Sequence, residues 1–234
     1  GVGGVGSHCA HALVRSGVQR LRLIDFDRVT LSSLNRHAVA RRSDVGIPKV
    51  SACAARFRAI APLCEIEVCD EMFSAASAPH LLLGSHGSLC RPDVVVDCID
   101  DLPTKADLLE VCVSHGLPVL SALGSGAKGD PTKLCISRGL QDVTNDPIAA
   151  ELRTSLRKRS VDVSNVPFAY SFQKADRSLL PLSEEQRSQP SEFGNVKNFR
   201  LRVIPVLGPQ PALSGVTLAA QALALLDERN LPPC

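Results

Sequence analysis

The chain opens on the glycine-rich stretch Gly1-Val2-Gly3-Gly4-Val5-Gly6-Ser7, and an apolar segment that ends at Asp25 follows it. Glycine lets the backbone turn tightly and approach a phosphate closely, and the first N–H groups of the next helix offer donors to the anion. The stretch therefore predicts a nucleotide-binding unit of Rossmann type. Asp25 lies about 20 residues further on, where an acid can accept the ribose hydroxyls. The alternative is a glycine turn that only lets a helix pack closely on a strand.

Strand-like and helix-like segments alternate through the first half of the chain. We expect strands over residues 21–26, 65–70, 93–97 and 118–123, and helices over residues 7–15, over 48–61 and from Pro103 to Gly116. This alternation predicts an α/β fold with a Rossmann-like, doubly wound, mainly parallel sheet. Residues 1–159 would form the nucleotide-binding domain. Residues 160–234 would complete the same domain with a long crossover loop, a strand over 199–204 and a helix over 212–226.

A glycine turn of this kind normally follows a central strand, and the sequence opens on the turn itself. We therefore expect that the first strand of the sheet is missing and that the sequence is a fragment. A targeting peptide or membrane anchor would then lie outside it. Within the sequence, no apolar run is long enough to span a bilayer.

Composition bounds the size of the fold and its partners. With 234 residues and 44% hydrophobic content, the chain can build one large core, and its net charge of +2 means that nucleic-acid binding would need local basic patches. The nine cysteines include no Cys-x-x-Cys pair. This pattern favours buried, reduced thiols in an intracellular protein over a disulfide framework, and no zinc is expected.

Four further sequence blocks follow the glycine turn in a fixed order. They are Asp25-Phe26-Asp27-Arg28-Val29, Leu34-Asn35-Arg36-His37, Gly46-Ile47-Pro48-Lys49 and Asp97-Cys98-Ile99-Asp100-Asp101. With them, the first half of the chain resembles the adenylating domain shared by ubiquitin-activating enzymes and the MoeB, ThiF and HesA proteins. The resemblance implies an enzyme that uses ATP and Mg²⁺ to activate a carboxylate by transfer of AMP.

The resemblance also implies roles for particular residues. Arg36 and Lys49 would contact the phosphates and neutralise charge as pyrophosphate leaves, and Asp100 would hold Mg²⁺; these three are the expected catalytic residues. Ser33 stands where many relatives carry asparagine, which puts one contact in doubt. Arg36 and Lys49 as ordinary surface cations, and Asp101 as a helix cap, are the alternatives. The expected nucleotide contacts are Gly3, Gly4, Gly6, Asp25, Asp27, Ser33, Asn35, Arg36, Lys49, Asp100 and Asp101.

The following segments narrow the choice of branch. Residues 121–133, Leu134-Cys135-Ile136-Ser137 and Asp146-Pro147-Ile148-Ala149 are similar to the tRNA threonylcarbamoyladenosine dehydratases, the TcdA-like branch, and residues 203–209 resemble its eukaryotic members. This likeness implies that ATP activates the carboxylate of a threonylcarbamoyl group on an adenosine beside the tRNA anticodon. The carbamoyl group of the same modification would then close a ring with loss of water. No protein nucleophile is needed.

A tRNA partner and a homodimer are implied by the same likeness. Six cations are candidates for contact with tRNA phosphates, although charge runs are often only solvated faces. The protein would lie at the mitochondrial outer membrane if it is a eukaryotic member, and in the cytoplasm otherwise. The candidate tRNA contacts are Lys128, Lys133, Arg153, Arg157, Lys158 and Arg159.

Three other functions stay open. The first is an enzyme that adenylates the C-terminal glycine of a ubiquitin-like modifier or sulfur-carrier protein, which would share every nucleotide motif. The second is a non-catalytic nucleotide-binding fragment. The third is a nicotinamide-dependent oxidoreductase, which would have no use for Arg36, Lys49 and Asp100 together.

Overall fold

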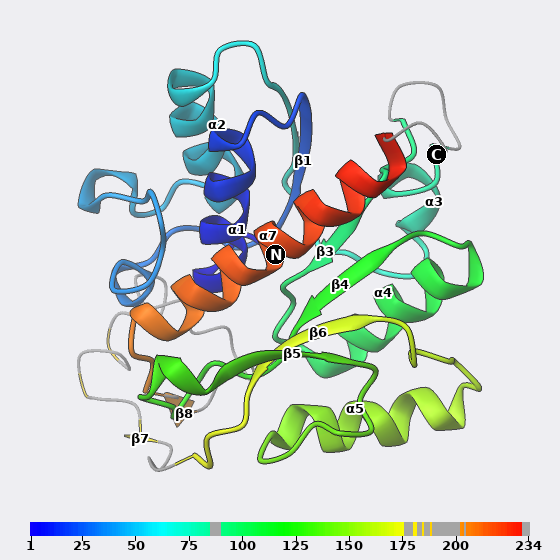
Figure 1. The fold of residues 1–234 in the computed structure, drawn as a ribbon. Helices are drawn as coiled ribbons and strands as arrows, with labels where there is room; N and C mark the ends of the chain where they lie inside the picture. Colours follow the sequence, from blue (N-terminus) through cyan, green and yellow to red (C-terminus); the bar gives the residue numbers. More distant parts are fainter. Residues whose placement is uncertain are drawn as a thin grey trace.

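A computed structural model describes residues 1–84, 90–175, 180–181, 184, 188, 202–203 and 205–230 (Figure 1). Helices and strands alternate along most of this range, as the sequence predicts, and η marks a short 3-10 helix. In chain order they are α1 (Gly4–Arg15), β1 (Arg20–Ile24), η1 (Leu31–Ser33), η2 (Arg42–Asp44), α2 (Lys49–Ile60), β2 (Glu65–Cys69), α3 (Ala78–Leu81), β3 (Val95–Asp97), α4 (Leu102–Ser114), β4 (Val119–Ala122), η3 (Pro131–Lys133), β5 (Leu134–Arg138), α5 (Pro147–Lys158), β6 (Pro167–Ser171), β7 (Leu180–Pro181), β8 (Arg202–Val203) and α7 (Pro209–Asn230).

The strands form a mainly parallel arrangement, which confirms the expected α/β fold. A four-stranded sheet has the order β3-β4-β6-β5, in which β3, β4 and β6 run parallel and β5 pairs antiparallel with β6. Strands β1 and β2 form a separate parallel pair, and β7 and β8 pair antiparallel. Among the described strands, no backbone ladder joins β1 to β3.

Cross-strand ion pairs fix the register of β1 on β2. Arg20 lies opposite Glu65 with Nε 2.9 Å from Oε2, and Arg22 lies opposite Glu67 with Nε 2.6 Å from Oε2. Opposite charges directly across a ladder stabilise one register over its neighbours. The carboxyl end of β1, which leads into Asp25, is therefore held in place.

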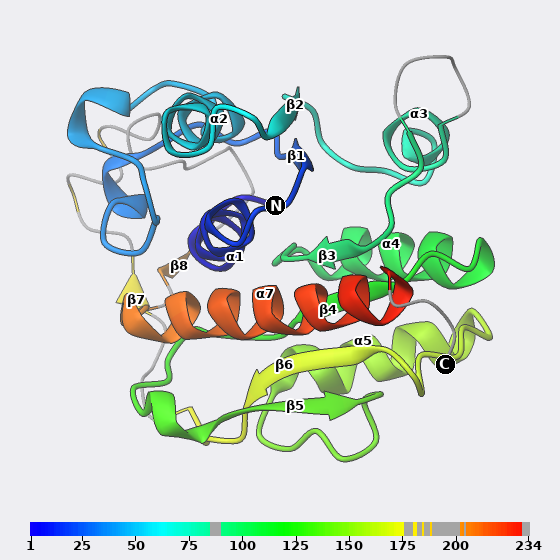
Figure 2. The ribbon, with the colours of Figure 1, turned by 45° about the horizontal axis from the view of Figure 1, so that its top comes forward.

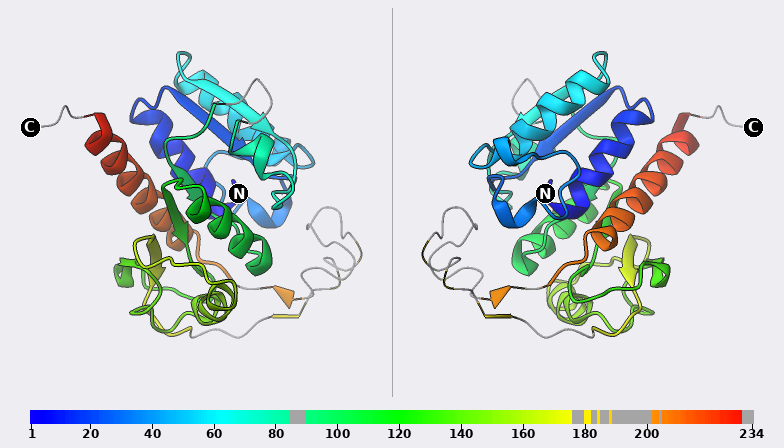
Figure 3. Two further views of the ribbon diagram at one scale, coloured as in Figure 1. Left: turned by 90° about the vertical axis from the view of Figure 1, so that its right-hand side faces the viewer. Right: turned by 90° about the vertical axis from the view of Figure 1, so that its left-hand side faces the viewer.

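Helices cover both faces of the four-stranded sheet (Figure 2). On one face, α1 and α7 pack on β4 and β6 through buried residues that include Leu13, Leu120 and Leu218. On the other face, α3, α4 and α5 enclose the largest cluster, which includes Leu109, Leu152 and Phe168. Helix α2 covers β1 and β2. The result is a layered molecule in which α1 and α7 lie side by side, as both side views show (Figure 3).

One prediction about the second half is wrong. The region of residues 160–199, expected as a crossover loop, contains β6, a strand whose residues Phe168–Ser171 are all buried. The expected C-terminal helix is present and longer than predicted, while much of the expected strand over 199–204 lies outside the described residues. None of the described helices combines the length and apolar character that crossing a membrane requires.

Candidate nucleotide site

The glycine turn brings the start of α1 close to the carboxyl ends of β1 and β3. A Cβ built on Gly6 would stand 1.9 Å from the carbonyl oxygen of Gly1, so no side chain fits there. A Cβ built on Gly3 would meet nothing within 4 Å, and no side chain caps the first turn of α1 in the described structure. No described side chain therefore caps the start of α1, and uncapped N–H groups at a helix start can bind phosphate.

Asp25 closes one side of this turn. Its Oδ2 accepts from the Val2 N–H at 2.7 Å and its Oδ1 accepts from the Asp27 N–H at 2.8 Å. Burial opposes ionisation of the carboxyl group, but nearby positive charge, including Lys49, and the two N–H donors outweigh it, so the pKa of Asp25 lies below its usual value. A carboxylate that already orders the glycine turn keeps lone pairs for a sugar hydroxyl.

Lys49 and Asp27 meet beside Asp25. Lys49 is the first residue of α2, its Nζ lies 2.7 Å from Asp27 Oδ2, and its backbone N–H donates to the Asp27 carbonyl at 2.9 Å. The side chain of Lys49 is 10% exposed. An ammonium carries three donors, so this ion pair orients the lysine and leaves it capacity for an anion. Both residues stay candidates for nucleotide contact.

Arg36 reaches the glycine turn from the loop after η1. Its Nη1 donates to the Ser32 carbonyl at 2.6 Å and to Asn35 Oδ1 at 3.0 Å. The stem lies over the turn, because a Cβ built on Gly4 would stand 3.1 Å from Arg36 Cγ and 3.2 Å from its Cδ. The structure therefore brings Arg36 to the predicted phosphate position.

The Ser33 hydroxyl is not available at the predicted phosphate position. It donates to the Thr30 carbonyl at 2.7 Å and accepts from the Thr30 N–H at 3.1 Å, and the residue is 6% exposed. The hydroxyl therefore satisfies the backbone of its own loop. The expectation that Ser33 contacts the nucleotide has no support in the geometry.

Asp100 and Asp101 follow β3 but differ in position. Asp101 caps α4, because its Oδ2 accepts from the Thr104 N–H at 3.1 Å and from the Thr104 hydroxyl at 2.6 Å. Its geometry fits the capping alternative. Asp100 is exposed at the carboxyl end of β3, where open α/β sheets bind ligands.

The acid at Asp100 fits a magnesium ion, which is commonly bound by one or two carboxylates together with water and substrate phosphates. No group of three or more His, Cys, Asp or Glu side chains converges within the described ranges. A cation at Asp100 would therefore take most of its ligands from the nucleotide and from water.

A buried ionic network behind Asp100 was missed from the sequence. Lys105 Nζ lies 2.6 Å from Asp97 Oδ2, 2.9 Å from the Ala122 carbonyl and 3.2 Å from Ser121 Oγ. Asp97 Oδ1 accepts from the Ile99 N–H at 3.0 Å. The network therefore ties β3, β4 and α4 together and fixes the turn that leads to Asp100. A lysine in an ordinary amphipathic helix gives no sequence signal for such a role.

Three of the six candidate tRNA contacts also bind groups within the fold, and their role in tRNA binding stays a prediction. Lys128 is 4% exposed, and its Nζ donates to Asp146 Oδ2 at 3.1 Å and to the Ser171 carbonyl at 2.8 Å. Arg153 donates to the Leu140 carbonyl, and Arg159 pairs with Asp107 and Glu110 of α4. Their donors hold the fold together.

The other three candidate tRNA contacts, Lys133, Arg157 and Lys158, have side chains that are more exposed than that of Lys128. The side chain of Lys133 is 43% exposed, and it lies 3.7 Å from Asp130. Arg157 and Lys158 occupy the last turn of α5, about 17 Å along the helix from its N-cap Asp146. That N-cap receives the Gly124 N–H at the carboxyl end of β4, so Arg157 and Lys158 lie at the far end of α5 from this edge.

Thiols near the site are poor nucleophiles. Burial raises the pKa of Cys98, beside the glycine turn, to about 11, and that of Cys53 to about 12. The thiolate is the reactive form of cysteine. These side chains therefore stay protonated at neutral pH.

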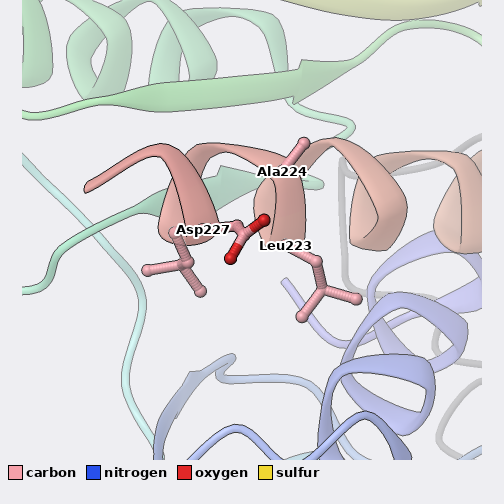
Figure 4. A pocket seen from close by; sticks show the side chains of 4 residues that line it. Leu223, Ala224 and Asp227 are labelled. Atoms are coloured by element: carbon pink, nitrogen blue, oxygen red, sulfur yellow. The ribbon is translucent and has the colours of Figure 1, made fainter. Parts of the chain in front are cut away.

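A surface hollow lies elsewhere on the described structure. It has a volume of about 420 Å³ and is lined by Leu223, Ala224, Leu226 and Asp227, near the end of α7 (Figure 4). Pro211, at the start of the same helix, is the residue of α7 that packs beside Gly4. The hollow lies about 18 Å along the helix from that contact and is not part of the nucleotide site.

The chain is similar to proteins of one known family. A family model described as "ThiF family" matches residues 1–233. The chain is 42% identical over 238 residues to tRNA threonylcarbamoyladenosine dehydratase 2 of Saccharomyces cerevisiae, covering 100% of this chain and 52% of that protein. It is 37% identical over 195 residues to tRNA threonylcarbamoyladenosine dehydratase of Bacillus subtilis, covering 83% of this chain and 71% of that protein.

A solved structure resembles the whole fold. The Escherichia coli tRNA N6-threonylcarbamoyladenosine dehydratase, TcdA, in complex with ATP superposes with a TM-score of 0.76 at 26% identity, covering 99% of this chain and 86% of that one. This chain spans about half the length of the yeast relatives that it matches.

Proposed function

This chain belongs to the ThiF family, and we propose that it is an ATP-dependent tRNA threonylcarbamoyladenosine dehydratase. The observation that carries the proposal is its similarity along its full length to a yeast protein of that name. The geometry supports the nucleotide half: the Arg36 stem lies beside Gly4, and no described side chain caps the start of α1. The likeness to TcdA in complex with ATP supports ATP as the nucleotide.

The chemistry follows from these groups. The carboxylate of the threonylcarbamoyl group attacks the α-phosphorus of ATP, and pyrophosphate leaves. The carbamoyl group then attacks the activated acyl carbon, AMP leaves, and a ring forms with net loss of one water from the modification. Arg36 and Lys49 would stabilise the negative charge that gathers as pyrophosphate departs. Asp100 would hold Mg²⁺, which shields the phosphates when bound.

The partners belong to the same proposal. Lys133, Arg157 and Lys158 have the exposed side chains that tRNA phosphates would need. A homodimer is supported by the outer face of α7, where Leu213 is 41% and Val216 48% exposed. A tRNA substrate implies a location inside the cell, and we propose the mitochondrial outer membrane for a eukaryotic protein of this branch; subcellular fractionation of the full-length protein tests this.

Turnover with two classes of acid tests the function. Purified protein is incubated with ATP, Mg²⁺ and either tRNA that carries threonylcarbamoyladenosine or a ubiquitin-like protein with a free C-terminal glycine. Pyrophosphate release only with the tRNA supports the proposal. Pyrophosphate release only with the protein would assign the chain to the modifier-activating alternative instead.

A further inference from the structure

Arg36 is bonded to Asn35, and Asn35 in turn contacts a segment from the far end of the sequence. Ser32 and Asn35 accept hydrogen bonds from the Arg36 guanidinium. The segment that leads into α7 lies against Asn35. The Asn35 Nδ2 donates to the Val206 carbonyl at 3.1 Å, which joins two segments that are 171 residues apart in the chain.

Gly208 makes the tightest of these contacts. A Cβ built on it would stand 2.5 Å from the carbonyl oxygen of Asn35. Its φ is not among the positive values, so backbone conformation does not demand glycine there. Glycine is required at position 208 because its backbone passes close to the backbone of Asn35. A side chain at 208 must push away either Asn35 or the start of α7.

Helix α7 cannot move easily, because it packs tightly on α1. A Cβ built on Gly215 would stand 2.3 Å from the Val5 carbonyl oxygen and 2.8 Å from the Cys9 nitrogen, both in α1. Pro211 closes the other end, with its Cβ 3.2 Å from a Cβ built on Gly4. Because α7 rests on α1 at both places, a group added at residue 208 displaces the Asn35 loop in preference to the helix.

The first turn of α7 acts by its shape. Pro209 and Pro211 have no N–H group, and the Gln210 N–H donates to the Leu207 carbonyl at 2.9 Å. The end of this helix therefore offers few donors to an anion. Because each proline also fixes its own φ, the first turn of α7 is a rigid surface beside Asn35 and Gly4.

We propose that Gly208 and the first turn of α7 are positioning elements for Arg36, so that the C-terminal helix is part of the ATP site. The inference rests on the proposed role of Arg36 as a phosphate contact. Asn35 transmits the effect, since its backbone touches Gly208 and its Oδ1 accepts from Arg36 Nη1. Moving Asn35 moves the guanidinium off the glycine turn.

The test is Gly208→Ala, with ATP affinity measured by calorimetry and turnover measured at saturating tRNA. A displacement of about 1 Å at a positioned group can cost about 100-fold in rate, so we expect turnover to fall about 10- to 100-fold and ATP binding to weaken as well. Because the clash is with backbone, the midpoint of thermal unfolding should also fall, so ATP affinity is measured well below that midpoint. The matched control is Gly129→Ala, where an added Cβ meets nothing within 4 Å, and it should bind ATP as the wild type does.

A double-mutant cycle shows whether the effect passes through Arg36. Arg36→Ala should weaken ATP binding, and adding Gly208→Ala to it should cause little further loss. An equal loss in both backgrounds overturns the inference. If Gly208→Ala does not fold, Pro211→Gly loosens the same surface by removing the Cβ that faces Gly4, and wild-type affinity in that variant overturns the inference too.

The same data separate this inference from the proposed function. If Arg36→Ala binds ATP as tightly as the wild type, the phosphate role of Arg36 fails and the inference fails with it. If Arg36→Ala binds weakly while Gly208→Ala binds normally, the ATP site stands and only the positioning role is overturned.

Discussion

Two glycines of the opening turn are needed for different physical reasons. Gly6 has no room for a side chain, because a Cβ there would overlap the Gly1 carbonyl oxygen at 1.9 Å. Gly3 has space around it in the protein alone. In the proposed ATP site, the phosphates approach the backbone through this space.

Gly3→Ala separates folding from nucleotide binding. We expect its thermal unfolding midpoint to match that of the wild type, because the added methyl contacts nothing in the free protein, while ATP binding weakens about tenfold or more because the methyl occupies phosphate space. Gly6→Ala is the comparison, and it should lose both stability and binding. Equal ATP affinity in Gly3→Ala and wild type would contradict the phosphate cradle.

The lowered pKa of the buried His37 side chain should make the stability of the protein depend on pH. Burial, assisted by the positive charge of Lys49, lowers the pKa of His37 to about 4, and its Nδ1 accepts from the backbone N–H groups of Val39 and Ala40. The unfolded chain then binds more protons than the folded one between about pH 6.5 and pH 4. Stability should fall as pH falls through this window, by about 3 kcal/mol in total.

Denaturant unfolding measured across this pH range checks the effect of His37. In His37→Asn, whose side-chain oxygen can accept from the same N–H groups, the slope of unfolding free energy against pH should be smaller. His80→Asn, which changes an exposed histidine paired with Glu71, is the control and should keep the slope. An unchanged slope in His37→Asn would show that other groups dominate.

At the scale of elements, the Lys105 network joins β3, β4 and α4 behind the acidic turn. Removing one partner of a buried ion pair leaves the other charge without compensation and costs about 3–5 kcal/mol. Lys105→Met should therefore lose about that much stability, measured by denaturant unfolding. Lys158→Met, at an exposed position in the last turn of α5, should change stability by less than about 0.5 kcal/mol.

Converting Asp97 as well tests whether the pair is the cause. In Lys105→Met with Asp97→Asn, no uncompensated charge remains, so part of the lost stability should return. If the double variant loses as much as the sum of the two single changes, the charges do not interact and this account of the network is wrong.

The elements also show what the sequence could predict. The glycine turn, the strand before Asp25 and the Asp146-Pro147 start of α5 were predictable, because capping, proline and close approach are local effects. Strand β6 was not, because Pro167-Phe168-Ala169-Tyr170-Ser171 is short and buried, and so lacks an alternating pattern. The ion pairs of Lys128 and Arg159 could not be predicted, because their partners Asp146 and Asp107 lie far along the chain.

For the molecule as a whole, α1 and α7 connect the two ends of the described chain. The two helices pack against each other along their length. Together they flank the glycine turn and cover one face of the four-stranded sheet. The outer side of α7 leaves Leu213 and Val216 exposed. An apolar helix face in this position is what a symmetric partner would cover.

Leu213→Glu tests the homodimer. If α7 lies in a dimer interface, the charge would be buried against the partner, so the variant should be monomeric by light scattering under conditions where the wild type is dimeric. Ala224→Glu, further along the same helix, also tests the extent of the interface. A dimer that survives Leu213→Glu would place the interface elsewhere.

The most direct measurement of the central claim is the mass of the modified nucleoside after reaction. The full-length protein is incubated with ATP, Mg²⁺ and tRNA that carries threonylcarbamoyladenosine, and the digested nucleosides are analysed by mass spectrometry. We predict that the modified nucleoside loses one water, that AMP and pyrophosphate form in equal amounts with it, and that Arg36→Ala abolishes all three changes. An unchanged nucleoside, with the wild-type protein shown to bind ATP, would contradict the account.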